Sequence, residues 1–162
     1  MAIGQEISSV KRGLPPAHYT LEIKKYSQLS KAVADRYESA IFKTKNESQD
    51  CNWRIVICPM GDDKDDKAKG NYLSFYIRLQ GSDDIFQSKR KLFAEYKMRV
   101  LDHPRIRIDE QRSGCWFSSE IRESGYPCFM SLDDLHKGGY LYGDTLIVEV
   151  EFLIVSVVKD QK

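Results

Sequence analysis

Apolar and polar residues alternate along much of this chain with the period of two that is typical of β-strands. The clearest example is the segment 72–80, where one face is an unbroken apolar row suited to a core: Leu73, Phe75, Ile77 and Leu79. Tyr76 lies on the opposite face, between Ser74 and Arg78. An aromatic residue in that setting is more useful for binding than for packing, so we expect Tyr76 on the outer face of its sheet.

The same alternation predicts further strands at 19–24, 37–43, 53–58, 93–101, 116–117 and 145–155. In the fourth of these, Tyr96 alternates with the apolar residues, which favours burial of its ring. Little helix is expected: residues 26–36 form a loop or one helical turn, and residues 133–135 form a turn capped by Ser131 or Asp133. Strands at short intervals with so little helix predict an all-β fold, an antiparallel sandwich.

A chain of 162 residues is long enough for one domain with a sizeable core and short for two. We expect an extended lead-in at 1–17, one domain at 18–158 and a C-terminal tail at 159–162. Neither a signal peptide nor an apolar window of roughly 18 residues is present, which favours the cytoplasm, with the nucleus as the alternative. The net charge of +1 gives no reason to expect a nucleic acid or a membrane as the general partner.

Few residues of this sequence offer chemistry. The cysteines form no Cys-x-x-Cys pair and have no histidine at zinc-ligand spacing, so we expect four reduced, buried thiols: Cys51, Cys58, Cys115 and Cys128. The carboxylates between Asp62 and Asp66 lack the glycine and the distal glutamate of a calcium loop, which favours a solvated hairpin tip. His18, His103 and His136 lie in polar settings away from the thiols, so neither an enzyme nor a bound cofactor is expected.

Basic residues are concentrated between Lys89 and Arg112. They lack the interleaved aromatic residues of a nucleic-acid-binding surface, so a solvated face is favoured over an anion-binding patch. Nucleic acid is therefore not expected as a partner, and an acidic or phosphorylated peptide is the alternative ligand for this face.

Five motifs occur in an order and spacing that are similar to those of a known family. They are Tyr19-x-Leu-x-Ile, Trp53-x-Ile-x-Ile-x-Pro-x-Gly61, Tyr72-Leu-Ser-Phe-Tyr76, Gly125-Tyr-x-x-Phe-Met-x-Leu132 and Gly139-Tyr-Leu-x-x-Asp-Thr-Leu146. On these residues the chain resembles a MATH domain, the TRAF-like domain, over 18–155. Its Pro-Pro-x-His-Tyr lead-in is similar to that of stand-alone or tandem MATH proteins of plants.

This resemblance implies an eight-stranded antiparallel β-sandwich that captures a short extended peptide of a partner protein on one sheet. Family members do no chemistry with this domain, which selects partners for attached ubiquitin-ligase adaptor, deubiquitinase or trimeric signalling modules. The chain is therefore expected to be a non-enzymatic adaptor. No heptad run, BTB-length extension or protease segment accompanies it, so we expect a lone module or a piece of a longer protein.

The resemblance implies that seven residues bind the peptide: Tyr76, Tyr96, Trp116, Glu123, Ser124, Gly125 and Tyr126. Tyr96 and Trp116 each have an alternative interpretation as core residues. The family's Asp-Trp-Gly-Phe signature reads Glu-Ser-Gly-Tyr in this chain, so Ser124 replaces the tryptophan. Truncating a buried interface aromatic typically costs about 2–4 kcal/mol of binding free energy, which predicts an altered ligand preference.

Two functions of different classes remain open. The first is a peptide-binding adaptor whose ligand lies on the face bearing Tyr76, with a larger ligand residue filling the space that Ser124 leaves. The second is a structural or self-association module, in which the groove is lost and an edge strand or exposed face pairs with a second copy. An open trough shared by Ser124 and Tyr76 would support the first function, and a filled one would support the second.

Overall fold

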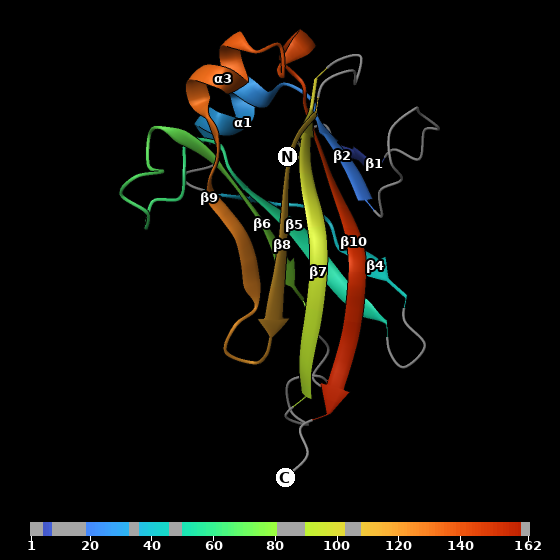
Figure 1. Ribbon diagram of the computed structural model, residues 1–162. Helices are drawn as coiled ribbons and strands as arrows, with labels where there is room; N and C mark the ends of the chain where they lie inside the picture. The colour runs from blue at the N-terminus through green and yellow to red at the C-terminus, as the bar shows by residue number, and fades with distance from the viewer. Residues whose placement is uncertain are drawn as a thin grey trace.

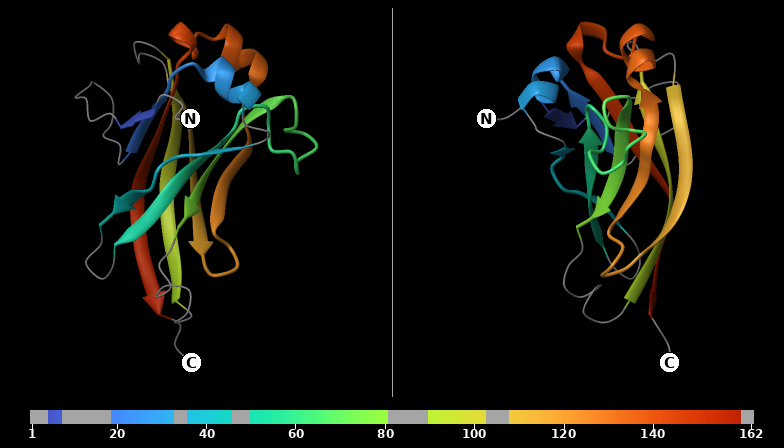
Figure 2. Two further views of the ribbon diagram at one scale, coloured as in Figure 1. Left: turned by 180° about the vertical axis from the view of Figure 1, so that it is seen from behind. Right: turned by 90° about the vertical axis from the view of Figure 1, so that its left-hand side faces the viewer.

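A computed structural model describes residues 5–7, 19–32, 36–45, 50–80, 90–102 and 108–159 of the protein. These residues form two antiparallel sheets that face each other as a sandwich, with two short helices side by side at one end (Figures 1 and 2). The predicted fold class is confirmed. Most of the lead-in, residues 46–49 and 81–88 of the two predicted connections, and residues 160–162 of the tail lie outside the described residues.

The first sheet, called sheet A, has the strand order β1-β2-β10-β7-β8. Its strands are β1 (Gln5–Ile7), β2 (Tyr19–Ile23), β10 (Leu146–Lys159), β7 (Arg90–Leu101) and β8 (Ile108–Phe117). β10 and β7 pair along nearly their whole length, with a bulge between Phe152 and Ile154. These two long strands are the axis of the sheet, and β8 is one of its edges.

The second sheet, called sheet B, has the order β3-β5-β6-β9, and β4 pairs with another part of β5. Its strands are β3 (Tyr37–Glu38), β4 (Phe42–Thr44), β5 (Cys51–Cys58), β6 (Tyr72–Leu79) and β9 (Glu123–Ser131). The sequence predicts one strand at 37–43, which the structure divides into β3 and β4. The reason lies at Ser39, whose hydroxyl rather than a backbone carbonyl accepts the N–H of Ile55 at 2.9 Å. The alternation predicts seven strands, and the family resemblance implies eight. The division of 37–43, together with β1 and β9, which the alternation did not predict, gives the ten described strands.

The core between the sheets consists of the apolar rows that the alternation predicts. At its centre is Trp53, fully buried, with ring centroids 4.6 Å from Phe152 and 5.2 Å from Phe117. Its indole N–H donates to the hydroxyl of Thr44 at 2.9 Å, so burial leaves no polar atom of the ring without a partner. Because these residues come from both sheets, the core fixes how the sheets face each other.

Two helices, α1 (Tyr26–Ala32) and α3 (Leu132–Lys137), and the turn η1 (Tyr142–Asp144) cover one end of the sandwich (Figure 1). The Ser131 hydroxyl accepts the Asp134 N–H at 3.0 Å, which confirms Ser131 as the cap of α3. Asp144 accepts hydrogen bonds from both the N–H and the hydroxyl of Ser27, which ties η1 to α1. None of the helices in the described ranges has the length and apolar character that crossing a membrane requires.

β8 is much longer than predicted, because a strand of two residues was expected and the strand has ten. Its positions alternate between half-buried and exposed, and most of its side chains are polar. In an edge strand, only the few positions that reach the core need apolar side chains. The alternation of apolar and polar residues in its sequence is therefore weak.

Candidate functional site

The edge of sheet B at β9 carries four of the seven predicted site residues. Among the described residues, β6 is the only strand that pairs with β9, so the other edge of β9 is open. β8, the edge of sheet A, lies beside it, because the short turn 118–122 connects the two strands (Figures 1 and 2). The result is an unpaired strand edge with side chains of both sheets next to it.

The inner side of β9 brings Tyr96, Ser124 and Tyr126 together. Ser124 is paired in register with Ile77, a core residue, and therefore faces the sandwich interior. Its hydroxyl shares a hydrogen bond with the hydroxyl of the fully buried Tyr96. Tyr126, half-buried against the core, donates from its hydroxyl to the backbone carbonyl of Arg112 at 2.8 Å. Both phenols thus link β9 to sheet A.

Cys115 is a fourth member of this inner group that the sequence did not indicate. Its register partner on β7 is Ala94, a core residue, so Cys115 faces inward. Burial raises the pKa of its thiol, and a hydrogen bond with Ser124 acts in the opposite direction. The signal that could have found it is the alternation that leads back from the core residue Phe117.

Trp116 lies on the opposite face of β8, away from Ser124. Its ring packs against Phe93 with a centroid distance of 5.1 Å and is 52% exposed to solvent on the outer face of sheet A. Neither expected position, groove or core, describes this placement. Neighbouring side chains of a strand point to opposite faces. A difference of one residue between the expected and the observed register therefore moves the Trp116 ring to the other face of the sheet.

Tyr76 is on the outer face of sheet B, as its alternation predicts, but it is covered. Its ring is 8% exposed and packs with Val56 and Cys58 in a small cluster separate from the main core. The hydroxyl donates to a carboxylate oxygen of Asp62 at 2.7 Å. Since Ser124 faces the interior and Tyr76 the outside, the two residues do not share a trough. The observation that would have supported a ligand on the face bearing Tyr76 is therefore not made, and that part of the expectation is corrected.

Glu123 and Gly125 share the outer face with Tyr76. The carboxylate of Glu123 lies 2.7 Å from a guanidinium nitrogen of Arg36 and 3.5 Å from one of Arg78. Gly125 is in register with Tyr76, and a Cβ atom at this glycine would lie only 2.2 Å from the carbonyl oxygen of Phe75. Glycine is therefore required for β9 to lie this close to β6.

Comparison with known proteins identifies the family of this chain. A family model described as MATH domain matches residues 18–152. The chain belongs to the MATH domain family. MATH domains are generally protein-interaction modules rather than enzymes.

One solved structure similar to this MATH domain is that of Notothenia coriiceps TRAF5. The two share 17% sequence identity at a TM-score of 0.58, and the match covers 88% of this chain and 76% of the TRAF5 chain. At this identity the likeness shows a common fold. Among curated protein sequences, none matches this chain.

Most of the cysteine, acidic and histidine side chains that the sequence singled out for possible chemistry have structural roles in this MATH domain, where the structure describes them. Cys51 and Cys58 are buried, whereas Cys115 and Cys128 are only half-buried, and these thiols are free. In the 62–70 loop, Asp65 accepts the Ala68 N–H at 2.9 Å, which helps to shape the turn. The described residues contain no cluster of three or more metal-ligating side chains. His18 and His103 lie outside the described residues.

The basic segment 89–112 is not a uniformly solvated face, which corrects the expectation from sequence. Arg99, in β7, is fully buried on the outer side of sheet A. Its guanidinium is 2.7 Å from Glu110 and 3.7 Å from Glu149, and it also bonds Glu151. Arg112 is paired with Glu95 in the same sheet. The described cations of this segment are therefore largely neutralised by acids on neighbouring strands.

The Tyr76→Phe variant of this MATH domain is expected to lose about 1 kcal/mol of unfolding free energy near pH 7, because a hydrogen bond to a carboxylate is removed. Burial acts to raise the pKa of Asp62, but hydrogen bonds from the Lys64 N–H and the Tyr76 hydroxyl and the charge of Arg36 outweigh it, so this pKa lies below its usual value. A depressed pKa stabilises the fold above the unfolded-state value of about 3.9 and ceases to do so as pH falls through the folded-state value.

The difference between wild type and Tyr76→Phe in urea unfolding should therefore be larger at pH 7 than near pH 3. Tyr72→Phe, on the same face of β6, is the matched control and should show no such pH dependence. A loss in Tyr76→Phe that is constant across this range would rule out the bond to Asp62 as its cause.

Proposed function

We propose that this MATH domain binds a short extended segment of a partner protein by strand addition at β9. The carrying observation is the open edge of β9 over Glu123–Tyr126, with Tyr96 and Tyr126 beside it. A peptide added to such an edge gains main-chain hydrogen bonds, and side-chain pockets next to the edge select its alternate residues. The domain would then act as a non-enzymatic adaptor in the cytoplasm, for ubiquitin-dependent or signalling partners.

The ligand preference follows from Ser124. Its hydroxyl is already engaged with Tyr96, and its side chain is much smaller than the tryptophan at this place in the related signature. We infer that a larger apolar ligand residue fills that place, with Tyr126 as the remaining aromatic wall. Because the ring of Tyr76 is covered, it would not contact the ligand. Its role would be to hold the 62–70 loop against β6 through the hydrogen bond to Asp62.

Peptide selection from a random displayed library tests this proposal. Peptides selected on wild type should bind Tyr126→Ala at least about 30-fold more weakly, which is the effect expected of a central interface aromatic. Trp116→Ala is the matched control, since that ring lies on the outer face of β8, and it should change affinity by less than about twofold. Circular dichroism of each variant checks that the sandwich is folded.

The proposal fails if no peptide family is enriched, or if Trp116→Ala weakens binding as much as Tyr126→Ala does. In the second case the ligand would occupy the outer face of sheet A rather than the β9 edge.

Self-association is the second candidate, and one observation favours it. Three exposed side chains, Trp116, Ile154 and Val158, surround the half-buried Phe93 on the outer face of sheet A. Contiguous exposed apolar groups commonly mark interaction surfaces. Sedimentation velocity distinguishes the two functions: concentration-dependent dimers that disappear in a Trp116→Ser/Ile154→Ser variant support self-association, and a monomer at high micromolar concentration rules it out.

A further inference from the structure

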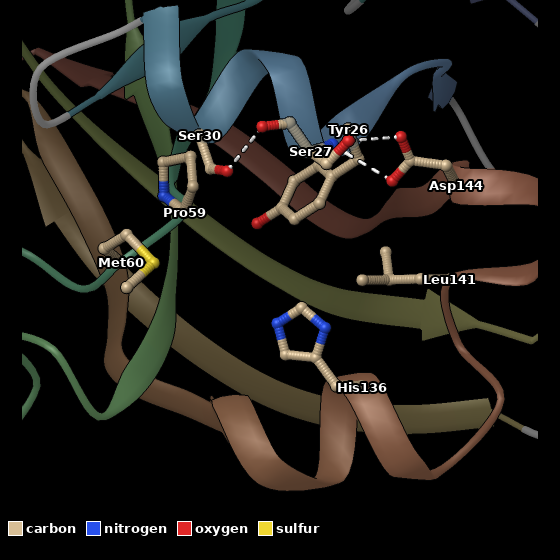
Figure 3. Close-up of a pocket in the computed structure, with 8 residues that line it drawn as sticks. All are labelled: Tyr26, Ser27, Ser30, Pro59, Met60, His136, Leu141 and Asp144. Carbon is tan, nitrogen blue, oxygen red and sulfur yellow. Dashed lines mark hydrogen bonds between the residues drawn. The ribbon is translucent and has the colours of Figure 1, made fainter.

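A pocket of about 320 Å³ opens at the helix-covered end of the sandwich, where β9 ends and α3 begins (Figures 1 and 3). Its walls come from α1, from the turn after β5, from α3 and from the segment before β10. The lining residues are Tyr26, Ser27, Ser30, Pro59, Met60, His136, Leu141 and Asp144. A volume of this size is at the lower end of the range for small-molecule sites.

Tyr26 gives this pocket an unsatisfied polar group. The residue is 3% exposed, and its hydroxyl has no hydrogen-bond partner in the structure. Figure 3 shows the ring extending into the pocket, with the hydroxyl on the side where Pro59, Met60 and His136 lie. A buried donor without a partner is costly, so the protein would gain stability from a ligand atom that accepts this hydrogen bond.

The protonation state of Tyr26 supports a donor role. Burial, followed by the nearby Cys58 thiol, raises the pKa of this phenol well above its usual value. The hydroxyl therefore keeps its proton at any ordinary pH.

Several of the other polar groups of the pocket are engaged with one another. The Asp144 carboxylate accepts from the Ser27 N–H at 3.0 Å and from the Ser27 hydroxyl at 2.6 Å. The hydroxyl of Ser30 donates to the Ser27 carbonyl at 2.9 Å. Neither lysine nor arginine lines the pocket. An anionic ligand would thus lose hydration without gaining a lysine or arginine partner, and a cationic ligand would have to share the Asp144 carboxylate with Ser27. Apolar surface of Pro59, Met60 and Leu141 is available to a neutral ligand.

We propose that this pocket binds a small, neutral, largely apolar molecule whose carbonyl oxygen accepts a hydrogen bond from the Tyr26 hydroxyl. The apolar part of the molecule would contact Met60 and Leu141, and His136 would border it from α3. This site is independent of the β9 edge, so its existence does not rest on the peptide-binding function.

Titration of the ¹⁵N-labelled full chain with benzamide tests the proposal. Benzoate and benzylamine have nearly the same shape and carry a negative and a positive charge. We expect saturable chemical-shift changes in α1, α3 and η1 with benzamide, with a Kd of about 1 mM for a fragment of this size. Both charged analogues should bind more weakly.

The decisive variant is Tyr26→Phe, which removes the hydroxyl and keeps the ring. It should weaken benzamide binding about tenfold, while its unfolding temperature stays unchanged or rises, because no protein hydrogen bond is lost. Tyr142→Phe, an exposed tyrosine on η1 that does not line the pocket, is the control and should bind as wild type does. The proposal is overturned by equal affinity of wild type and Tyr26→Phe, by tighter binding of a charged analogue, or by no saturable shift up to about 20 mM benzamide.

Discussion

Replacing Arg99 by methionine is expected to lower the free energy of unfolding by about 3–5 kcal/mol, the largest effect predicted for a single side chain outside the apolar core. Arg99 is fully buried, and its guanidinium contacts three carboxylates, those of Glu110, Glu149 and Glu151. Glu149 is also fully buried, with one oxygen held by the hydroxyl of Thr20 at 2.9 Å. Without Arg99, the fully buried Glu149 and its two neighbouring carboxylates lose the guanidinium that they share, and a buried charge that loses its partner is more costly than the loss of the ion pair itself.

Urea unfolding of matched variants measures this effect. Arg112→Met removes an arginine of similar charge from the same sheet, but its pair with Glu95 is largely exposed, so a loss below about 1 kcal/mol is expected. The double variant Arg99→Met/Glu149→Gln should recover part of the stability, because it removes one uncompensated charge. Equal losses in Arg99→Met and Arg112→Met would contradict the buried network.

Replacing Gly125 by alanine is the second large effect, with an expected loss of about 2–4 kcal/mol of unfolding free energy. The added Cβ would lie 2.2 Å from the carbonyl oxygen of Phe75 and 2.6 Å from the Cα of Tyr76. Both contacts are with the backbone of β6, which cannot rotate away as a side chain can. Relief requires β9 to move from β6, and this would also displace Ser124 and Tyr126 from the candidate site.

Gly114→Ala, on the neighbouring edge strand β8, provides the control. A Cβ there would lie 3.1 Å from the ring of Phe93, a side chain that can shift. Alanine is also better than glycine in a strand interior, so stability should change by less than about 1 kcal/mol. Thermal and urea unfolding of both variants measure the two effects. An equally small loss of unfolding free energy in Gly125→Ala and Gly114→Ala would contradict the close approach of β9 to β6.

The period of two in the sequence predicts which face of a strand each residue occupies, and for long strands this was sufficient. The apolar row of β6 and the burial of Tyr96 in β7 are both confirmed. The alternation cannot say what covers the outer face of a sheet. Tyr76 is correctly placed on that face, but Asp62 reaches its hydroxyl from a loop, a contact between residues that no local pattern connects.

The site was predicted in part for a related reason. The resemblance groups the contiguous residues Glu123–Tyr126, and the structure places all four on β9, a strand at the edge of sheet B. The resemblance places Trp116 at a groove position only to within a residue or two, and in a strand a difference of one residue decides the face. Cys115 therefore takes the inner position beside Ser124 while Trp116 faces solvent.

The buried Arg99 could not be predicted because its charge suggests solvent exposure, and its partners are distant in sequence. Glu110 comes from β8, and Glu149 and Glu151 come from β10, on the two sides of β7. Only the pairing of these strands brings the four side chains together. The three carboxylates outnumber the single guanidinium, which argues against an anionic partner at this part of the face.

Backbone hydrogen exchange, measured with and without a library-selected peptide, tests the central claim of strand addition most directly. An added strand should slow exchange at β9 amides that have no partner on β6, with the largest effect within 123–126, and leave the outer edge of β8 unchanged. Unaltered exchange across β9 at saturating peptide, or protection confined to sheet A, would contradict binding at the β9 edge.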